Sequence, residues 1–93
     1  MQRVIVHGRV QGVNFRSFVV EEARQRSLEG WVRNLENGSV EAVFSGPQVE
    51  VDAMIALCRV GPRFASVSEI ELFTADGDTL GLRRPGEKFS RIG

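Results

Sequence analysis

The segment from residue 8 to residue 16, GRVQGVNFR, joins a strand pattern to a helix pattern and so constrains how the fold begins. Before it, a short apolar run predicts a buried strand over residues 2–7. After it, apolar side chains recur at helical spacing and predict a helix over residues 15–26. The apolar positions of that helix are Phe15, Phe18, Val19 and Ala23. The chain therefore opens with a strand, a glycine-containing turn and an amphipathic helix.

This turn also has the residue types of an anion-binding site. Gly12 can adopt a positive φ without steric cost, so that neighbouring amides turn inward and the following helix adds its positive dipole end. Arg16 lies in the first helical turn, where its planar guanidinium can reach back to two oxygens of a phosphate or carboxylate. The same pattern fits a plain turn beside a solvated arginine. The residues alone leave both interpretations open.

The rest of the chain predicts further strands and one more helix. The predicted strands cover residues 28–35, 39–45, 67–73 and 88–92. Asn37 and Gly38 form a hairpin signal, and the second helix starts at Pro47 and ends at Gly61. Residues 75–86 predict a loop with a weak strand at residues 80–82. This order predicts an α+β fold, the ferredoxin-like split βαβ sandwich (βαββαβ), with two helices on one face of an antiparallel sheet.

Length and composition limit the classes of protein that the chain can represent. Residues 1–93 predict a single small domain, which we expect to be a monomer. A formal net charge of zero gives no global field for nucleic acid or membranes, so we expect neither as a partner. One cysteine and one histidine exclude an internal disulfide and the usual zinc sites, and Cys58 is expected in the core. Without a leader after Met1 or a long apolar run, the expected location is the cytoplasm.

Two stretches of the sequence resemble the signature segments of acylphosphatases. The first is GRVQGVNFR at residues 8–16, and the second comprises GWVRN at residues 30–34 and NGSVE at residues 37–41. The resemblance extends over nearly the whole chain. It implies hydrolysis of carboxyl–phosphate mixed anhydrides, without a metal, a cofactor or a covalent intermediate. The position that matches the phosphate-gripping arginine of the family is Arg16, and the one that matches its water-positioning asparagine is Asn34.

The resemblance also implies a phosphate-binding loop that acts mainly through backbone N–H groups. Its residues are Gln11, Gly12, Val13, Asn14, Phe15 and Arg16. Apart from Arg16, we expect their side chains to be replaceable, and we expect Arg9 and Arg33 to add positive potential. The first two strands are expected to lie side by side near the loop, which would bring Asn34 to Arg16. Ser27 stands where the family commonly has a helix-ending glycine.

Other functions fit parts of the same pattern. RNA-recognition domains share this order of elements, but the strands lack their stacking aromatics and the chain has no tyrosine. His7 is a conceivable general base, although a histidine within a strand more often packs or faces solvent. An accessory or maturation domain that handles carbamoyl phosphate, or a non-catalytic ferredoxin-like binding module, would look similar. The favoured interpretation is an acylphosphatase that acts on a small-molecule acyl phosphate.

Overall fold

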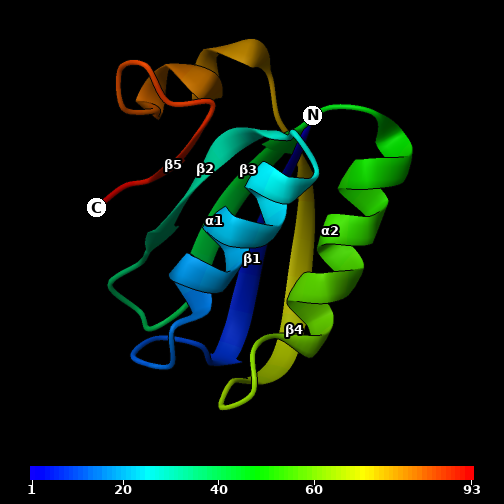
Figure 1. The fold of residues 1–93 in the computed structure, drawn as a ribbon. Helices are drawn as coiled ribbons and strands as arrows, with labels where there is room; N and C mark the ends of the chain where they lie inside the picture. Colours follow the sequence, from blue (N-terminus) through cyan, green and yellow to red (C-terminus); the bar gives the residue numbers. More distant parts are fainter.

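The computed structural model describes residues 1–93 and contains one five-stranded sheet and two α-helices (Figure 1). In chain order the elements are β1 (Gln2–Arg9), α1 (Phe15–Gln25), β2 (Glu29–Asn34), β3 (Val40–Ser45), α2 (Gln48–Val60), β4 (Ser66–Thr74), the 3-10 helix η1 (Gly77–Leu82) and β5 (Phe89–Arg91). The strands lie in the order β4-β1-β3-β2-β5. The predicted ferredoxin-like βαββαβ arrangement is confirmed.

The sheet is antiparallel except at one edge. β1 pairs antiparallel with β3 and with β4, and β3 pairs antiparallel with β2. β5 instead runs parallel to β2, with Phe89 opposite Gly30. The chain crosses through η1 after β4 and so reaches the far edge running in the same direction as β2. The predicted antiparallel sheet is therefore extended into a mixed sheet by a short edge strand.

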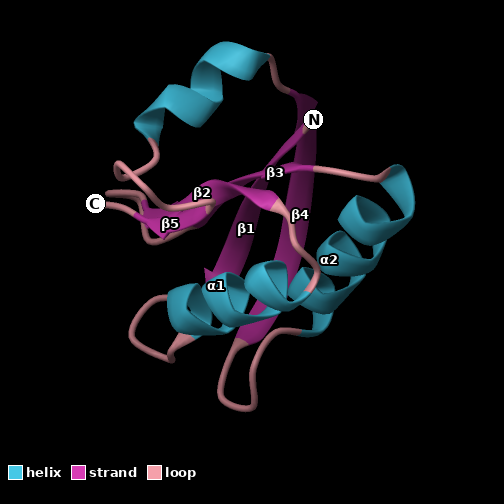
Figure 2. Ribbon diagram, turned by 45° about the horizontal axis from the view of Figure 1, so that its top comes forward, coloured by secondary structure: helices cyan, strands magenta, loops and turns pink.

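Both α-helices pack on the same face of the sheet, and η1 lies on the other side (Figure 2). The helix residues buried against the sheet are Phe15, Val19 and Ala23 of α1 and Val51, Met54, Ile55 and Cys58 of α2. They form one core with alternate residues of the strands, including Val4 and Val6 of β1. The predicted apolar faces are thus the ones that are buried. Neither α-helix has the length and apolarity needed to cross a membrane.

The weak strand predicted at residues 80–82 is wrong, because this stretch belongs to η1. The Asp76 side chain accepts a hydrogen bond from the Asp78 N–H at 3.1 Å, and the Thr79 N–H donates to the Asp76 carbonyl. These local bonds start a tight turn in place of an extended strand. The Trp31 Nε1–H then donates to the Thr79 carbonyl at 2.7 Å, which fixes η1 over the open face of the sheet.

Candidate active site

The turn between β1 and α1 presents backbone N–H groups that have no acceptor within the chain. Gly12 and Asn14 have φ values of 74° and 69°, and α1 begins at the next residue, Phe15. No backbone N–H of residues 11–17 donates a hydrogen bond to another group of the protein. Converging amides at the N-terminus of a helix favour negative charge. We call residues 11–17 the anion cup, because this geometry suits an anionic ligand.

A cavity of about 240 Å³ opens at the anion cup and brings Arg16 and Asn34 together. Arg16 comes from the first turn of α1, and Asn34 is the last residue of β2. The Oδ1 atom of Asn34 is buried without a hydrogen-bond partner in the chain. An unpaired buried acceptor costs roughly 1–3 kcal/mol, so the partner of this amide is expected to come from a ligand or water. The cavity is lined by Val10, Gly12, Asn14, Phe15, Arg16, Ser17, Asn34 and Arg91.

Two guanidinium groups give this cavity its charge. Arg16 Nη1 donates to the Gly93 carbonyl at 3.3 Å, and Arg91 Nη1 donates to Ser17 Oγ at 3.0 Å. Desolvation, and then the charge of nearby Arg91, lowers the pKa of Arg16. The cavity lining contains no carboxylate that would neutralise the two arginines. An anion bound between them would relieve their mutual repulsion.

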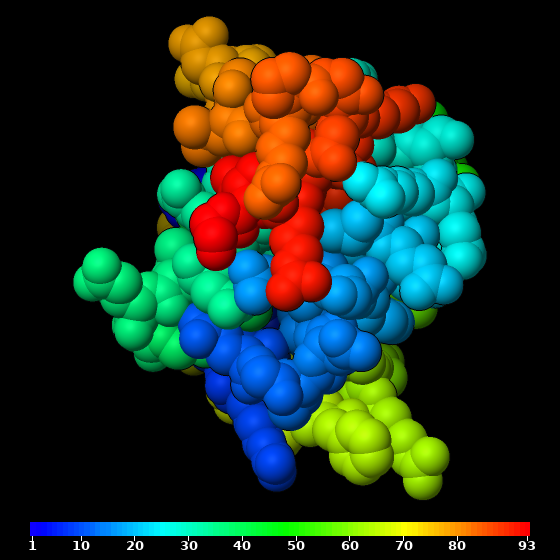
Figure 3. All heavy atoms as spheres, turned by 60° about the vertical axis from the view of Figure 1, so that its left-hand side comes forward, coloured from blue at the N-terminus to red at the C-terminus, as the bar shows by residue number.

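Arg91 is the charged residue that sequence reasoning missed. It is the last residue of β5, which pairs parallel with β2 and places Arg91 opposite Val32. This pairing brings the C-terminal segment, red in Figure 3, against the blue residues of the anion cup and the start of α1. The sequence predicted the edge strand but carried no signal for its partner or its direction.

The side chain of Gln11 connects the anion cup to the hairpin that follows Asn34, and β1 and β2 are not neighbouring strands. The expectation that β1 and β2 lie side by side is wrong, because β3 pairs with both and lies between them. Gln11 Nε2 instead donates to the Leu35 and Ser39 carbonyls, at 2.8 and 2.9 Å, on either side of the β2–β3 hairpin. Figure 1 shows this hairpin and the β1–α1 turn at the same end of the molecule.

Two side chains of the predicted loop are part of the structure and are not freely replaceable. Gln11 makes the two bonds to the hairpin, and Phe15 is buried in the core. Val13 is partly buried and packs against the same core. The expectation that only the backbone of these residues matters is therefore wrong for Gln11 and Phe15. Their side chains position the turn whose amides form the anion cup.

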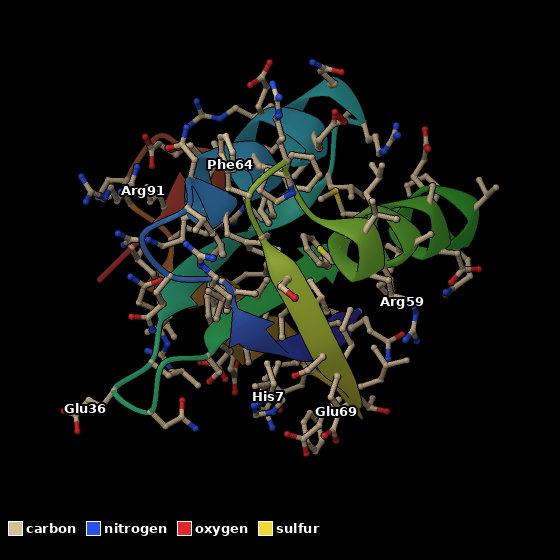
Figure 4. All side chains as sticks on the ribbon, turned by 90° about the horizontal axis from the view of Figure 1, so that it is seen from below. His7, Glu36, Arg59, Phe64, Glu69 and Arg91 are labelled. Carbon is tan, nitrogen blue, oxygen red and sulfur yellow. The ribbon has the colours of Figure 1, made fainter.

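Three residues considered from the sequence lie outside the cavity. Arg33 Nε donates to Glu41 Oε1 at 2.7 Å, a carboxylate that Arg3 also contacts, and neither Arg33 nor the exposed Arg9 lines the cavity. His7 Nε2 lies 2.6 Å from Glu71 Oε1, on the sheet face away from the helices. Figure 4 shows His7 beside the edge strand β4, well apart from Arg91. None of His7, Arg9 and Arg33 lines the cavity, so His7 is not placed to act there as a base.

The remaining candidate groups do not form a second chemical centre. Cys58 is buried, as predicted, and burial raises the pKa of its thiol to about 12. It stays protonated and packs as a core side chain. No three or more His, Cys, Asp and Glu side chains are grouped where they could hold a metal ion. The donors gathered at the cavity are guanidinium, amide and backbone N–H groups, which suit an anion.

Fold and cavity together define a ferredoxin-like α+β protein whose turn between the first strand and the first helix has free backbone N–H groups. The family model for acylphosphatases matches residues 2–81. An acylphosphatase of Rhodopseudomonas palustris strain BisB18 is 50% identical over 92 residues, which are 99% of this chain and 93% of the relative. One of Bradyrhizobium diazoefficiens is 51% identical over 88 residues, covering 95% and 89% of the two chains. The chain belongs to the acylphosphatase family.

Solved structures show the same relationship. The crystal structure of acylphosphatase from Bacillus subtilis matches with a TM-score of 0.84 and 35% identity, covering 99% of this chain and 97% of that one. Full-length HypF, in a phosphate- and nucleotide-bound form, matches with a TM-score of 0.74 and 25% identity. That match covers 99% of this chain but only 12% of HypF. The fold therefore forms nearly the whole of the Bacillus subtilis protein but only a small part of HypF.

Proposed function

We propose that the protein hydrolyses acyl phosphates to a carboxylate and inorganic phosphate. The observation that carries this proposal is the shared cavity, where the free amides of the anion cup, Arg16 and the unpartnered Asn34 amide face one small space. The cup amides and the Arg16 fork hold the phosphoryl oxygens. Membership of the acylphosphatase family supports the same reaction.

The proposed reaction needs positioning more than acid–base chemistry. Asn34 orients a water molecule for attack on phosphorus, in line with the bond to the acyl oxygen. The water oxygen forms the new P–O bond while the bond from phosphorus to the acyl oxygen breaks, and the carboxylate leaves with the bonding electrons. The water proton passes to a phosphoryl oxygen of the substrate. This route explains a cavity lining without histidine or carboxylate.

The direct test follows the loss of benzoyl phosphate absorbance with wild-type protein, Arg16→Ala and Asn34→Ala. Reactions contain a chelator, and circular dichroism verifies that each variant is folded. Arg59→Ala is the matched control, because Arg59 is exposed on α2 and Figure 4 shows it on the other side of the molecule from Arg91.

We expect wild type and Arg59→Ala to hydrolyse benzoyl phosphate alike. The Arg16 variant should lose about 10²–10³-fold in kcat/KM, as expected when a main transition-state donor is removed. The Asn34 variant should lose mainly kcat, since it positions water and not phosphate. Folded wild-type protein without activity would refute the proposal, and full activity in Asn34→Ala would refute the role of that residue.

A further inference from the structure

A second and larger hollow, of about 770 Å³, continues from the anion cup along the outer side of α1. It shares Arg16, Ser17 and Arg91 with the smaller cavity, so the two spaces meet at these residues. α1 forms one wall, and residues 84–93 contribute to the other. Figure 3 looks onto this side, where the red C-terminal segment lies next to the blue start of α1 and the orange residues before it. We call this hollow the α1 groove.

The α1 groove carries an excess of positive charge although the whole chain has none. Its charged side chains are Arg16, Arg24, Arg84, Arg91, Glu21 and Glu87. Four arginines and two glutamates leave two more positive than negative groups, against a net charge of zero for all 93 residues. Local charge of this kind acts on a ligand at short range, where salt screens it least.

Arg84 is the groove arginine that no other group of the chain engages. Arg24 donates to the Phe89 carbonyl at 3.0 Å and lies 3.6 Å from Glu87. Arg91 is bound to Ser17. Arg84 is exposed, and its backbone N–H is fixed by Ser90 Oγ at 2.9 Å, while its guanidinium makes no hydrogen bond or ion pair. The backbone of Arg84 is therefore held in place, while its guanidinium group is free to bind a ligand.

The direction of the proposed reaction places the acyl group in this groove. In-line attack needs the water and the leaving carboxylate at opposite ends of the phosphoryl group. Asn34 lines the smaller cavity and not the groove, whereas Arg16 and Arg91 line both. With water held at Asn34 and phosphate at Arg16, the leaving group extends past Arg91 into the groove.

We propose that the α1 groove binds the acyl portion of the substrate and that Arg84 selects acyl groups with a second, remote anionic group. The inference rests on the proposed acyl phosphate hydrolysis and narrows its substrate class to phosphorylated dicarboxylic acids and compounds with equivalent charge. Arg84 is a specificity residue in this assignment. It pairs with the remote anion in the ground state and in the transition state alike, so its effect falls on KM more than on kcat.

The test compares two substrates of nearly equal shape, succinyl phosphate and the methyl ester of its free carboxyl group. The wild-type ratio of their kcat/KM values is expected to favour the charged compound about three- to ten-fold at low salt, and to fall as salt is added. Arg84→Gln should bring the ratio close to one, and Arg84→Lys should retain most of it. Glu21→Gln should raise it, because a carboxylate in the groove is removed.

Arg59→Gln on α2 serves as the charge-matched control and should leave the ratio unchanged, since Arg59 does not line the groove. A wild-type ratio near one, with benzoyl phosphate still hydrolysed, would overturn this inference and leave the proposed function standing. A preference that persists in Arg84→Gln would also overturn it. Protein that hydrolyses none of these acyl phosphates would overturn both proposals.

Discussion

The two ends of α1 differ in how the chain treats its free backbone groups. At the C-terminal end, the Leu28 N–H donates to the Ala23 carbonyl at 3.0 Å and the Ser27 N–H donates to the Arg24 carbonyl at 3.1 Å. This pair of bonds is the Schellman motif, which satisfies terminal carbonyls within the chain. At the N-terminal end, no N–H of residues 11–17 has an acceptor in the protein. The C-terminal end of α1 is therefore capped within the chain, whereas the N–H groups at its N-terminal end remain available to a ligand.

Both ends also contain a non-glycine residue with positive φ. Ser27 has a φ of 56° and Asn14 a φ of 69°, a conformation that costs roughly 1–2 kcal/mol in most L-residues but that Asn tolerates better. At Ser27 the conformation closes the two hydrogen bonds of the cap. At Asn14 the carbonyl accepts the first helical bond, from the Phe18 N–H at 3.1 Å, but the side chain makes no capping bond. The positive φ at the N-terminal end thus starts the helix and leaves the amides of residues 11–17 available to a ligand.

The largest effect is expected from Arg16→Lys, which keeps the positive charge at the N-terminal end of α1 but removes the planar guanidinium group. An ammonium cannot bind two phosphoryl oxygens in parallel, so kcat/KM for benzoyl phosphate should fall about 10²–10³-fold, nearly as far as in Arg16→Ala. The stability of the fold should change little, because Arg16 makes only one bond, of 3.3 Å, within the chain. Near-wild-type activity in the lysine variant would mean that charge alone holds the phosphate.

A smaller effect is expected when the N-terminal end of α1 is detached from the hairpin that carries Asn34. Gln11→Met has similar length but cannot donate to the Leu35 and Ser39 carbonyls. We expect a loss of roughly 1–2 kcal/mol in the free energy of unfolding and about tenfold in kcat/KM, because two hydrogen bonds are lost and the cup shifts from Asn34.

The matched control is Gln48→Met, because Gln48 Nε2 donates to Asp52 Oδ1 at 2.8 Å on an exposed turn of α2. Urea unfolding and benzoyl phosphate kinetics measure both variants. Loss of stability without loss of activity in Gln11→Met would show that the side chain only holds the hairpin and does not position the cup.

Periodicity and turn residues were sufficient to predict most of this fold. The apolar spacing of α1, the apolar run of β1, the hairpin at Asn37 and Gly38, and the Pro47 and Gly61 boundaries of α2 are local signals, and local signals appear in the sequence. The 3-10 helix was missed because its hydrogen bonds start from the side chain and carbonyl of Asp76, which read equally well as a loop. The parallel direction of β5 has no local signal at all.

Residues of the candidate site that lie in one segment could be predicted from the sequence. Those brought together from distant segments could not. Arg16 and the glycine turn lie within nine consecutive residues, and the family resemblance added Asn34 from β2. Arg91 reaches the cavity only through the pairing of β5 with β2, and Gln11 connects to the hairpin only through tertiary contacts. Conversely, Arg33 contacts Glu41, which Arg3 also contacts, and composition cannot show these contacts across strands.

A finer comparison uses two glycines with positive φ and open space around them. Gly12 in the anion cup has a φ of 74° and Gly38 in the hairpin a φ of 93°, and a Cβ on either would meet nothing within 4 Å. Alanine at each position should cost about 1 kcal/mol of stability through backbone strain alone. Only Gly12→Ala should also raise KM for benzoyl phosphate, by a few-fold. An equal rise in KM for Gly38→Ala would show that the effect is one of general stability.

The smallest effect concerns the C-terminal end of α1. Ser27→Gly removes the strain of a positive φ from an exposed residue while the two bonds of the cap remain. We expect a gain of about 0.5–1 kcal/mol, which corresponds to a rise in Tm of roughly 2–8 °C for a domain of this size. Ser27→Ala is the control, because it removes the hydroxyl but keeps the strained φ, and it should give no gain. Differential scanning calorimetry measures both.

Activity toward benzoyl phosphate should stay at the wild-type level in both Ser27 variants, because Ser27 itself lines neither the cavity nor the α1 groove. If Ser27→Gly stabilised the protein and also lowered kcat/KM, the two ends of α1 would be coupled. The geometry of the N-terminal amides would then depend on the strained φ of Ser27 at the C-terminal end. An unchanged kcat/KM together with a higher Tm means that the cap can be improved independently of the site, as expected because Ser27 lines neither hollow.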